Sequence, residues 1–258
     1  MLYGLEDKIE LFKRLIKENN LRQSYLFFGE PQIGKFTFAG ALVNFLENGE
    51  FVSPTGARPL IDAKFFTPDE SGSIGIDAVR ELKKFLYQRP VVSAYRSAVF
   101  DSAESLTPEA QNALLKIIEE PPQSSLIIFI AAETSAFPPT LASRFVKVYF
   151  PRLKQKSIEK YLKEKLKIDA SRAALTAGQS FGRIGRAIQS LQTPSSKTDS
   201  EPESLSKYLE KLILSLRKNI LKNSSKLNWL LEREELVKRY NLNPKLQYKA
   251  IQQIINHE

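Results

Sequence analysis

Apolar and polar positions follow two different periods along the first 150 residues. Short apolar runs predict buried strands at residues 25–28, 98–100, 126–131 and 146–150. Apolar side chains at helical spacing predict helices over residues 5–18, 36–46, 76–86 and 107–120. The Gly- and Pro-rich residues 49–75 predict a loop with one short strand at 63–66. Strands that alternate with helices and have apolar cores are typical of a parallel sheet covered on both faces, so residues 1–150 are expected to form an α/β domain.

The pattern changes at Pro151, after which only helical spacing is visible. Residues 151–192 are expected to form a small helical lid of two or three short helices. Residues 193–203 are polar and have little capacity to pack, which predicts a linker. Residues 204–258 return to helical spacing and predict a short all-α segment.

The composition excludes several kinds of site. The chain has no cysteine, so disulfides, thiolate zinc sites and cysteine nucleophiles are excluded. Its only histidine, His257, is the penultimate residue and cannot anchor a metal cluster or a catalytic triad. No apolar run approaches the roughly 20 residues that span a bilayer, and the first residues lack the pattern of a secretory signal. We therefore expect a cytoplasmic protein with no metal and no membrane partner.

Charge is distributed unevenly along the chain. Residues 1–150 carry 16 basic and 18 acidic side chains, whereas residues 151–258 carry 22 and 11. The basic surplus in the second part is compatible with a polyanionic partner, but also with lysine-rich helices that are simply well solvated.

Residues 29–36, with the sequence GEPQIGKF, follow a predicted strand and open a predicted helix. This is the context of a Walker A loop, G-x-x-x-x-G-K-[ST], in which backbone N–H groups and the lysine hold phosphates. The candidate nucleotide-binding residues are Gly29, Gly34 and Lys35, together with Asp101 at the end of the 98–100 strand, where a Walker B acid reaches a metal.

Two positions of this candidate site lack the expected chemistry. Phe36 stands where a hydroxyl should hold Mg²⁺, and Thr37 lies about 100° further around the helix, so it should not substitute. Ser102 follows Asp101, where hydrolytic proteins need an acid that polarises water. Binding of ATP or Mg²⁺ by this chain is therefore not expected.

Three segments resemble the bacterial clamp-loader AAA+ family. The most specific is residues 101–122, DSAESLTPEAQNALLKIIEEPP, and it is preceded by a matching segment, SIGIDAVREL, at residues 73–82. Residues 139–145, PTLASRF, resemble the family's Ser-Arg-Cys motif, with Phe145 in place of the cysteine. The resemblance implies an AAA+ RecA-like sheet, a small helical lid and, at residues 204–258, a short collar-like helical segment for oligomerisation. Family members often carry a four-cysteine zinc module, but residues 50–68 contain no cysteine.

The resemblance also implies two further losses and one retained residue. The family's sensor residue, a threonine or asparagine, falls at residues 131–132, which are both alanine, and the lid's sensor arginine falls near Gly185. In the family, the arginine of Ser-Arg-Cys projects into the nucleotide site of a neighbouring subunit. This implies a trans-acting arginine finger at Arg144, with Ser143 orienting its loop. The alternative is that Arg144 only forms a salt bridge with a carboxylate.

Within the family, these losses are most similar to those of the delta-prime branch of DNA polymerase III subunits. The implied role is a subunit that is not an enzyme by itself but belongs to the DNA polymerase III holoenzyme. Its partners would be the ATPase motor subunit and the clamp-opening subunit, with the sliding clamp and primed DNA reached through the complex. Two alternatives remain open: an ATP-hydrolysing motor subunit of the same loader, and a DNA-binding adaptor that uses the basic C-terminal half.

Overall fold

The computed structural model describes residues 2–54 and 58–192, together with 208–209, 212–213, 216, 220–239, 247–248, 250–251 and 254. The chain divides into two compact units, Met1–Thr193 and Pro194–Glu258. The first unit contains the sheet, its covering helices and the lid.

The core of the first unit is a sheet of five parallel strands in the order β2-β3-β4-β1-β5. The strands are β1 (Ser24–Phe28), β2 (Ala63–Phe66), β3 (Arg96–Phe100), β4 (Ser125–Ala131) and β5 (Val146–Tyr149). Every residue of β4 is buried, and Tyr25 of β1 lies between Ile128 of β4 and Val146 of β5. The prediction of a parallel sheet is confirmed. The buried polar residues of the strands lie in the first two positions of their strands, so the apolar runs fill the centre of the sheet; they are Ser24, Arg96, Ser97 and Ser125.

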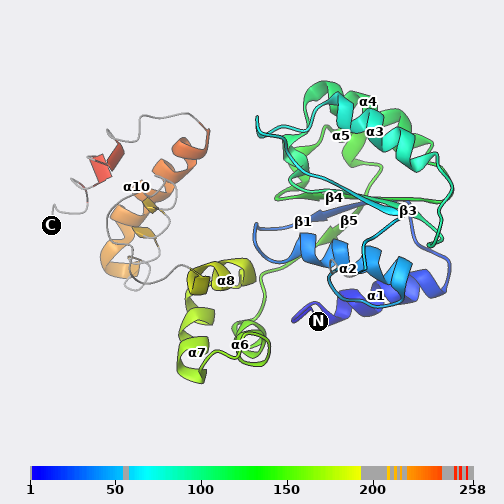
Figure 1. Ribbon diagram of the computed structural model, residues 1–258. Helices are drawn as coiled ribbons and strands as arrows, with labels where there is room; N and C mark the ends of the chain where they lie inside the picture. The colour runs from blue at the N-terminus through cyan, green and yellow to red at the C-terminus, as the bar shows by residue number, and fades with distance from the viewer. Residues whose placement is uncertain are drawn as a thin grey trace. The chain divides into compact units, whose positions relative to one another are not determined.

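Helices cover both faces of the sheet (Figure 1). The helices α1 (Glu6–Lys17) and α2 (Lys35–Asn48) lie on one face, while α3 (Ile76–Leu86), α4 (Pro108–Glu119) and the short α5 (Pro139–Ala142) lie on the other. Neighbouring strand residues point to opposite faces, so Phe27 packs under α1 and α2 whereas Leu26 packs under α3 to α5.

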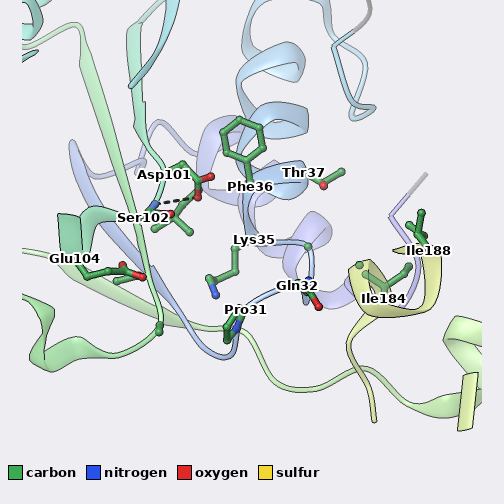
Figure 2. Close-up of a pocket in the computed structure, with 15 residues that line it drawn as sticks. Pro31, Gln32, Lys35, Phe36, Thr37, Asp101, Ser102, Glu104, Ile184 and Ile188 are labelled. Atoms are coloured by element: carbon green, nitrogen blue, oxygen red, sulfur yellow. Dashed lines mark hydrogen bonds between the residues drawn. The ribbon is translucent and has the colours of Figure 1, made fainter. Parts of the chain in front are cut away.

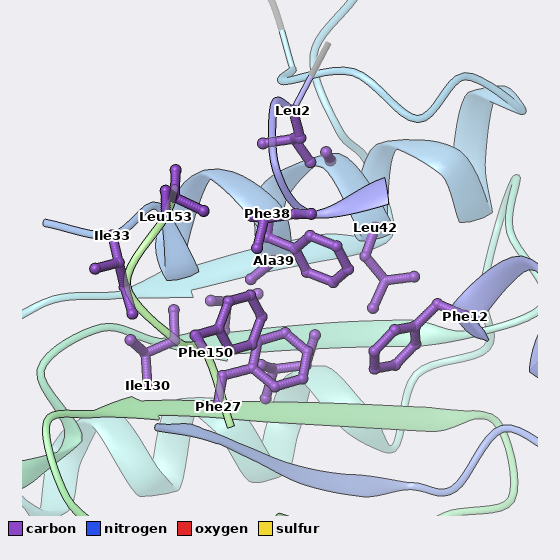
Figure 3. Close-up of a cluster of buried hydrophobic side chains, with 14 of the residues drawn as sticks. Leu2, Phe12, Phe27, Ile33, Phe38, Ala39, Leu42, Ile130, Phe150 and Leu153 are labelled. Carbon is purple, nitrogen blue, oxygen red and sulfur yellow. The ribbon is translucent and has the colours of Figure 1, made fainter. Parts of the chain in front are cut away.

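Aromatic rings fill the layer between the sheet and the first two helices (Figure 3). The ring centroid of Phe27 lies 5.7 Å from that of Phe12, 5.8 Å from that of Phe38 and 5.1 Å from that of Phe150. Because the cluster joins α1, α2, β1 and the end of β5, it fixes the strand end from which the candidate phosphate loop leaves.

Three short elements were not predicted from the sequence: the 3-10 turns η1 (Ala103–Ser105) and η2 (Thr134–Ala136), and the helix α5. None is long enough to repeat a helical period. The predicted start of α4 is confirmed, because the Thr107 side chain accepts a hydrogen bond from the Ala110 N–H and Pro108 occupies the first turn.

The lid consists of three short helices, α6 (Gln155–Glu164), α7 (Ala170–Gln179) and α8 (Ile184–Gln192). Its buried side chains Ile158, Leu162 and Ala187 belong to the same apolar cluster as Phe27. The Tyr3 hydroxyl also donates a hydrogen bond of 2.7 Å to the Glu164 carboxylate. The lid is therefore packed against the sheet domain and tied to the segment that precedes α1.

In the second unit, α10 (Ile220–Arg239) contributes Leu227 and Leu230 to a small cluster with Leu209, Ile213 and Ile251. The expected linker, residues 193–203, lies outside the described residues, as does most of the chain between 204 and 219. In the part of the chain that the structure describes, no helix has the length and apolarity to cross a bilayer.

Candidate functional site

The loop of residues 29–34 leaves the carboxyl end of β1 and leads directly into α2. Gly29 has φ of 141°, and a Cβ atom there would lie 2.3 Å from the backbone oxygen of Phe150. Only glycine fits this close approach between the loop and the chain that leaves β5. The predicted strand–loop–helix context of the loop is thus confirmed.

A cavity of about 350 Å³ opens above this loop (Figure 2). Its walls are the loop and the first turn of α2, the ends of β3 and β4, and α8 of the lid. The lining residues are Pro31, Gln32, Gly34, Lys35, Phe36, Thr37, Asp101, Ser102, Glu104, Ile130, Ala131, Ala132, Ile184, Gly185 and Ile188. The fold thus brings the predicted Gly34, Lys35 and Asp101 to one cavity, whereas Gly29 does not line it.

Lys35 is buried, and its ammonium is bound by the backbone of its own loop. Its Nζ donates a hydrogen bond to the backbone oxygen of Gly29 and another of 2.7 Å to that of Glu30. Burial lowers the pKa of Lys35, and the nearby carboxylates of Glu104, Asp101 and Glu30 counteract part of that change. Two of its three donors are therefore already satisfied within the loop.

Two carboxylates line the same cavity. Asp101 Oδ1 accepts a hydrogen bond of 3.0 Å from the N–H of Ser102, which adopts a left-handed conformation with φ of 51°. Glu104, in the turn η1, also faces the cavity (Figure 2). Glu104 was not predicted from the sequence as a cavity residue, although its position three residues after Asp101 places it near the end of the same strand.

The aromatic ring at the Walker hydroxyl position has its own packing partner. Phe36 packs edge-to-face on Phe65, with ring centroids 5.6 Å apart. In the view of Figure 2 the Phe36 ring lies between Asp101 and Thr37. Thr37 lines the cavity on the side of Ile188, away from Asp101, which agrees with its position on the next step around the helix.

The lid rests directly on the loop. Gly185 N–H donates to the backbone oxygen of Gln32 at 2.8 Å, and Gln32 Nε2 donates to Gln189 Oε1 at 3.3 Å. A Cβ atom on Gly185 would lie 2.9 Å from the Cβ of Gln32, so this contact has no room for a side chain. The α8 residues that line the cavity are Ile184, Gly185 and Ile188; the arginines at 183 and 186 are not among them.

Arg144 lies on the face of α4 and α5 and does not line this cavity. Its guanidinium donates to the backbone oxygen of Thr140 and, at 2.5 Å, to Oε1 of Glu119, the last residue of α4. The Arg144 and Glu119 side chains are 36% and 45% exposed. Ser143 Oγ donates to the same Thr140 oxygen at 3.2 Å. The structure thus contains the salt bridge of the alternative interpretation, formed between two solvent-exposed groups.

The chain is similar in sequence to known proteins. Residues 4–154 match a family model described as DNA polymerase III, delta subunit. The DNA polymerase III subunit gamma/tau of Mycoplasma pneumoniae is 29% identical over 203 residues, which are 74% of this chain and 30% of that protein. The subunit of the same name from Mycobacterium bovis is 34% identical over 48% of this chain and 23% of its own length. The chain therefore matches about a third or less of the length of these relatives.

A eukaryotic relative and two solved structures agree with the fold. Replication factor C subunit 3 of Saccharomyces cerevisiae is 26% identical over 78% of this chain and 58% of that protein. A DNA polymerase III gamma subunit-related protein of Thermotoga maritima superposes with a TM-score of 0.59 and 22% identity, covering 95% of this chain and 97% of that one. The Thermotoga maritima RuvB Holliday junction branch migration motor superposes with a TM-score of 0.53 and 15% sequence identity, covering 88% of this chain and 67% of that one.

Proposed function

Because the chain belongs to the DNA polymerase III clamp-loader family of AAA+ proteins, we propose that it is a delta-prime-like subunit that does not hydrolyse ATP itself. In this proposal it supplies Arg144 to the ATP site of a neighbouring motor subunit. With that subunit and the clamp-opening subunit, it takes part in placing a sliding clamp on primed DNA during DNA replication.

The cavity residues do not fit Mg²⁺–ATP. The Walker hydroxyl is replaced by the Phe36 ring, and no acid follows Asp101. Lys35 donates to the backbone oxygens of Gly29 and Glu30, so two of its three donors are engaged within its own loop. This supports a subunit without hydrolysis and without a nucleotide cofactor of its own.

The lid contact supports the same conclusion. Gly185 occupies the place where the resemblance expects a sensor arginine, and its backbone is hydrogen-bonded to the loop at Gln32. A larger residue at 185 would push α8 away from the loop. We infer that the lid takes its position from contacts within the chain, and not from a bound nucleotide.

The observation that carries the trans role is the exposure of Arg144 together with its motif context. A guanidinium is planar, permanently charged and suited to phosphate oxygens. Its only described side-chain partner, Glu119, is itself exposed, so a phosphate of higher charge in a neighbouring site can replace it at small cost. A buried ion pair would not allow this exchange.

The alternative of a DNA-binding adaptor uses the basic C-terminal half, of which the structure describes the lid and parts of the second unit. Three of the seven basic residues between 152 and 167 are paired with carboxylates: Arg152 with Glu30, Lys160 with Glu164 and Lys163 with Glu159. These pairs are solvent-accessible and lower the local net charge without preventing an exchange of carboxylate for phosphate, so the preference for the delta-prime-like role rests on the motif at Arg144.

The decisive experiment is ATP turnover of the reconstituted complex, made with the motor and clamp-opening subunits of the same organism. Arg144→Ala is expected to lower DNA-stimulated turnover by more than roughly tenfold, since a trans arginine stabilises transition-state charge. Arg144→Lys should restore little, because it keeps the charge but loses the planar fork.

The matched control is Arg80→Ala, which removes another exposed arginine that is paired with a carboxylate, Asp77. Size-exclusion chromatography must show that all variants assemble equally. Unchanged turnover in an assembled Arg144→Ala complex would refute the proposed role. Magnesium-dependent ATP turnover by the isolated chain, abolished by Lys35→Ala, would favour the motor subunit instead.

A further inference from the structure

One edge of the sheet ends at β5, which pairs with β1 on one side only. Among the described residues no other strand pairs with its second side. Alternate N–H and C=O groups of such an edge point outward and are available to another extended chain. Val146 and Tyr149 of this strand are exposed, with 40% and 56% of their surface accessible.

A groove of about 650 Å³ runs between this edge and α1. Its floor is largely apolar and comes from one face of α1 and from the strand itself. The lining residues are Lys8, Leu11, Phe12, Leu15, Asn20, Arg22, Tyr25, Val146, Lys147, Val148, Tyr149 and Pro151. The groove is thus bounded on one side by a helix and on the other by free strand backbone.

The charge of the groove has a single sign. Lys8, Arg22 and Lys147 line it, and no carboxylate of the described residues does so. None of the three forms an ion pair within the described part of the chain. This concentration of cations is notable in residues 1–150, which carry more acidic than basic side chains.

We propose that this groove is a docking site for an extended segment of a partner protein in which acidic and apolar residues alternate, and that the segment adds to β5 as a sixth strand. Backbone hydrogen bonds to the strand edge would supply affinity, and alternate side chains would meet the apolar floor and the three cations. Lys147 and Pro151 discourage indiscriminate pairing of this edge, so a complementary acidic residue provides the selectivity.

The lining favours a peptide over single-stranded nucleic acid. Nucleic-acid grooves of this kind combine cations with several stacking aromatic rings. Here Tyr149 is the exposed aromatic of the groove, and its ring already packs against Phe28 with centroids 5.3 Å apart. The remaining floor is aliphatic or belongs to the buried rings of Phe12 and Tyr25.

The test is to pan a phage library of random ten-residue peptides against the immobilised full chain and to measure the enriched peptides by fluorescence anisotropy. Peptides that alternate acidic and apolar residues should be enriched. Lys147→Glu and Arg22→Glu should each weaken their binding by roughly tenfold, since an attraction becomes a repulsion. Methylation of alternate backbone amides of the peptide should abolish its binding, because in the proposal those N–H groups form hydrogen bonds with β5.

The matched control is Lys17→Glu, which reverses an exposed lysine of α1 outside the groove and should leave binding unchanged. Thermal unfolding must show that all three variants remain folded. Absence of enriched peptides, or binding that is insensitive to Lys147 and Arg22, would overturn the proposal. Displacement of the peptides by a single-stranded 20-nucleotide DNA that binds more tightly would assign the groove to nucleic acid and overturn it as well. No clamp-loader partner is needed, so the outcome is independent of the role of Arg144.

Discussion

Nη2 of Arg144 lies 2.5 Å from Oε1 of Glu119, and this ion pair joins the end of α4 to the residues that follow α5. Both partners belong to segments that resemble the clamp-loader family, but their contact joins positions 25 residues apart and was not predicted from the sequence. The contact holds the guanidinium at two points, Glu119 and the Thr140 oxygen, while leaving it open to solvent.

Because this ion pair is exposed, substitutions in it are predicted to affect the stability of the chain little, whatever they do to ATP turnover. Arg144→Ala and Glu119→Gln should each change the free energy of unfolding by less than about 1 kcal/mol, because exposed ion pairs contribute little. Glu119→Gln should leave turnover of the reconstituted complex within about threefold, in contrast to the large loss on Arg144→Ala. Urea unfolding and a coupled ATPase assay check this. Equal losses from both substitutions would mean that the pair acts only as a structural contact.

Lys35 is predicted to act as a structural residue. Lys35→Met keeps the apolar stem but removes the ammonium from the oxygens of Gly29 and Glu30. The loss should be about 1–3 kcal/mol in the free energy of unfolding, because the two oxygens lose their donor in a partly buried place. ATP turnover of the complex assembled with the Lys35→Met variant should not fall along with the stability of the chain. Calorimetric titration of the isolated wild-type chain with Mg²⁺–ATP should give no heat of binding; a saturable isotherm would contradict the prediction.

Two lid glycines are expected to respond oppositely to alanine. Gly185→Ala places a Cβ 2.9 Å from that of Gln32 and should destabilise the chain by about 1–3 kcal/mol through overpacking. Gly178→Ala, within α7, has its nearest neighbour at an ordinary 3.5 Å and should stabilise the chain by up to about 1 kcal/mol, since alanine favours a helix. Chemical denaturation of both variants measures the difference. Stabilisation by both would show that the lid does not rest on the loop.

A fully buried carboxylate, Asp62, holds the loop before β3. It accepts hydrogen bonds from the N–H groups of Val91, Val92 and Ser93 at 2.6 to 2.9 Å and lies 3.1 Å from the Arg96 guanidinium. Burial raises the pKa of the Asp62 carboxyl, but the three N–H donors and Arg96 outweigh it, so the pKa lies below its ordinary value of 3.8.

This carboxylate predicts a pH dependence of stability. Because the folded pKa of Asp62 is lower than the unfolded one, its contribution is complete above pH 3.8 and is lost as the pH falls from there through the folded pKa. Asp62→Asn should cost about 3–5 kcal/mol at neutral pH, since it leaves Arg96 buried without its counter-charge. Urea unfolding between pH 2.5 and 7 should show that the gap between wild type and variant narrows only in acid. A constant gap would refute this assignment.

The strands and long helices of the first unit could be predicted because their signal is local. A buried strand such as β4 needs only a continuous apolar run, and α3 needs only apolar residues at helical spacing; both begin and end within a residue of their predicted limits. The family motifs are local as well, since residues 101–122 and 139–145 keep their order whatever the fold does. The short α5 and η1 have no such period, which is why they were missed.

The amino-acid order alone therefore determined the parallel α/β architecture and the position of the candidate phosphate loop, in which Phe36 and Ser102 stand where the Walker motifs have a hydroxyl and an acid. It did not determine where the remaining polar groups find their partners. Folding turned Lys35 toward the loop oxygens, brought Gly185 of the lid onto Gln32 and set Glu119 against Arg144. Such contacts join segments that are separated along the chain, and their distances depend on how helices and strands pack, which no local pattern of residues contains.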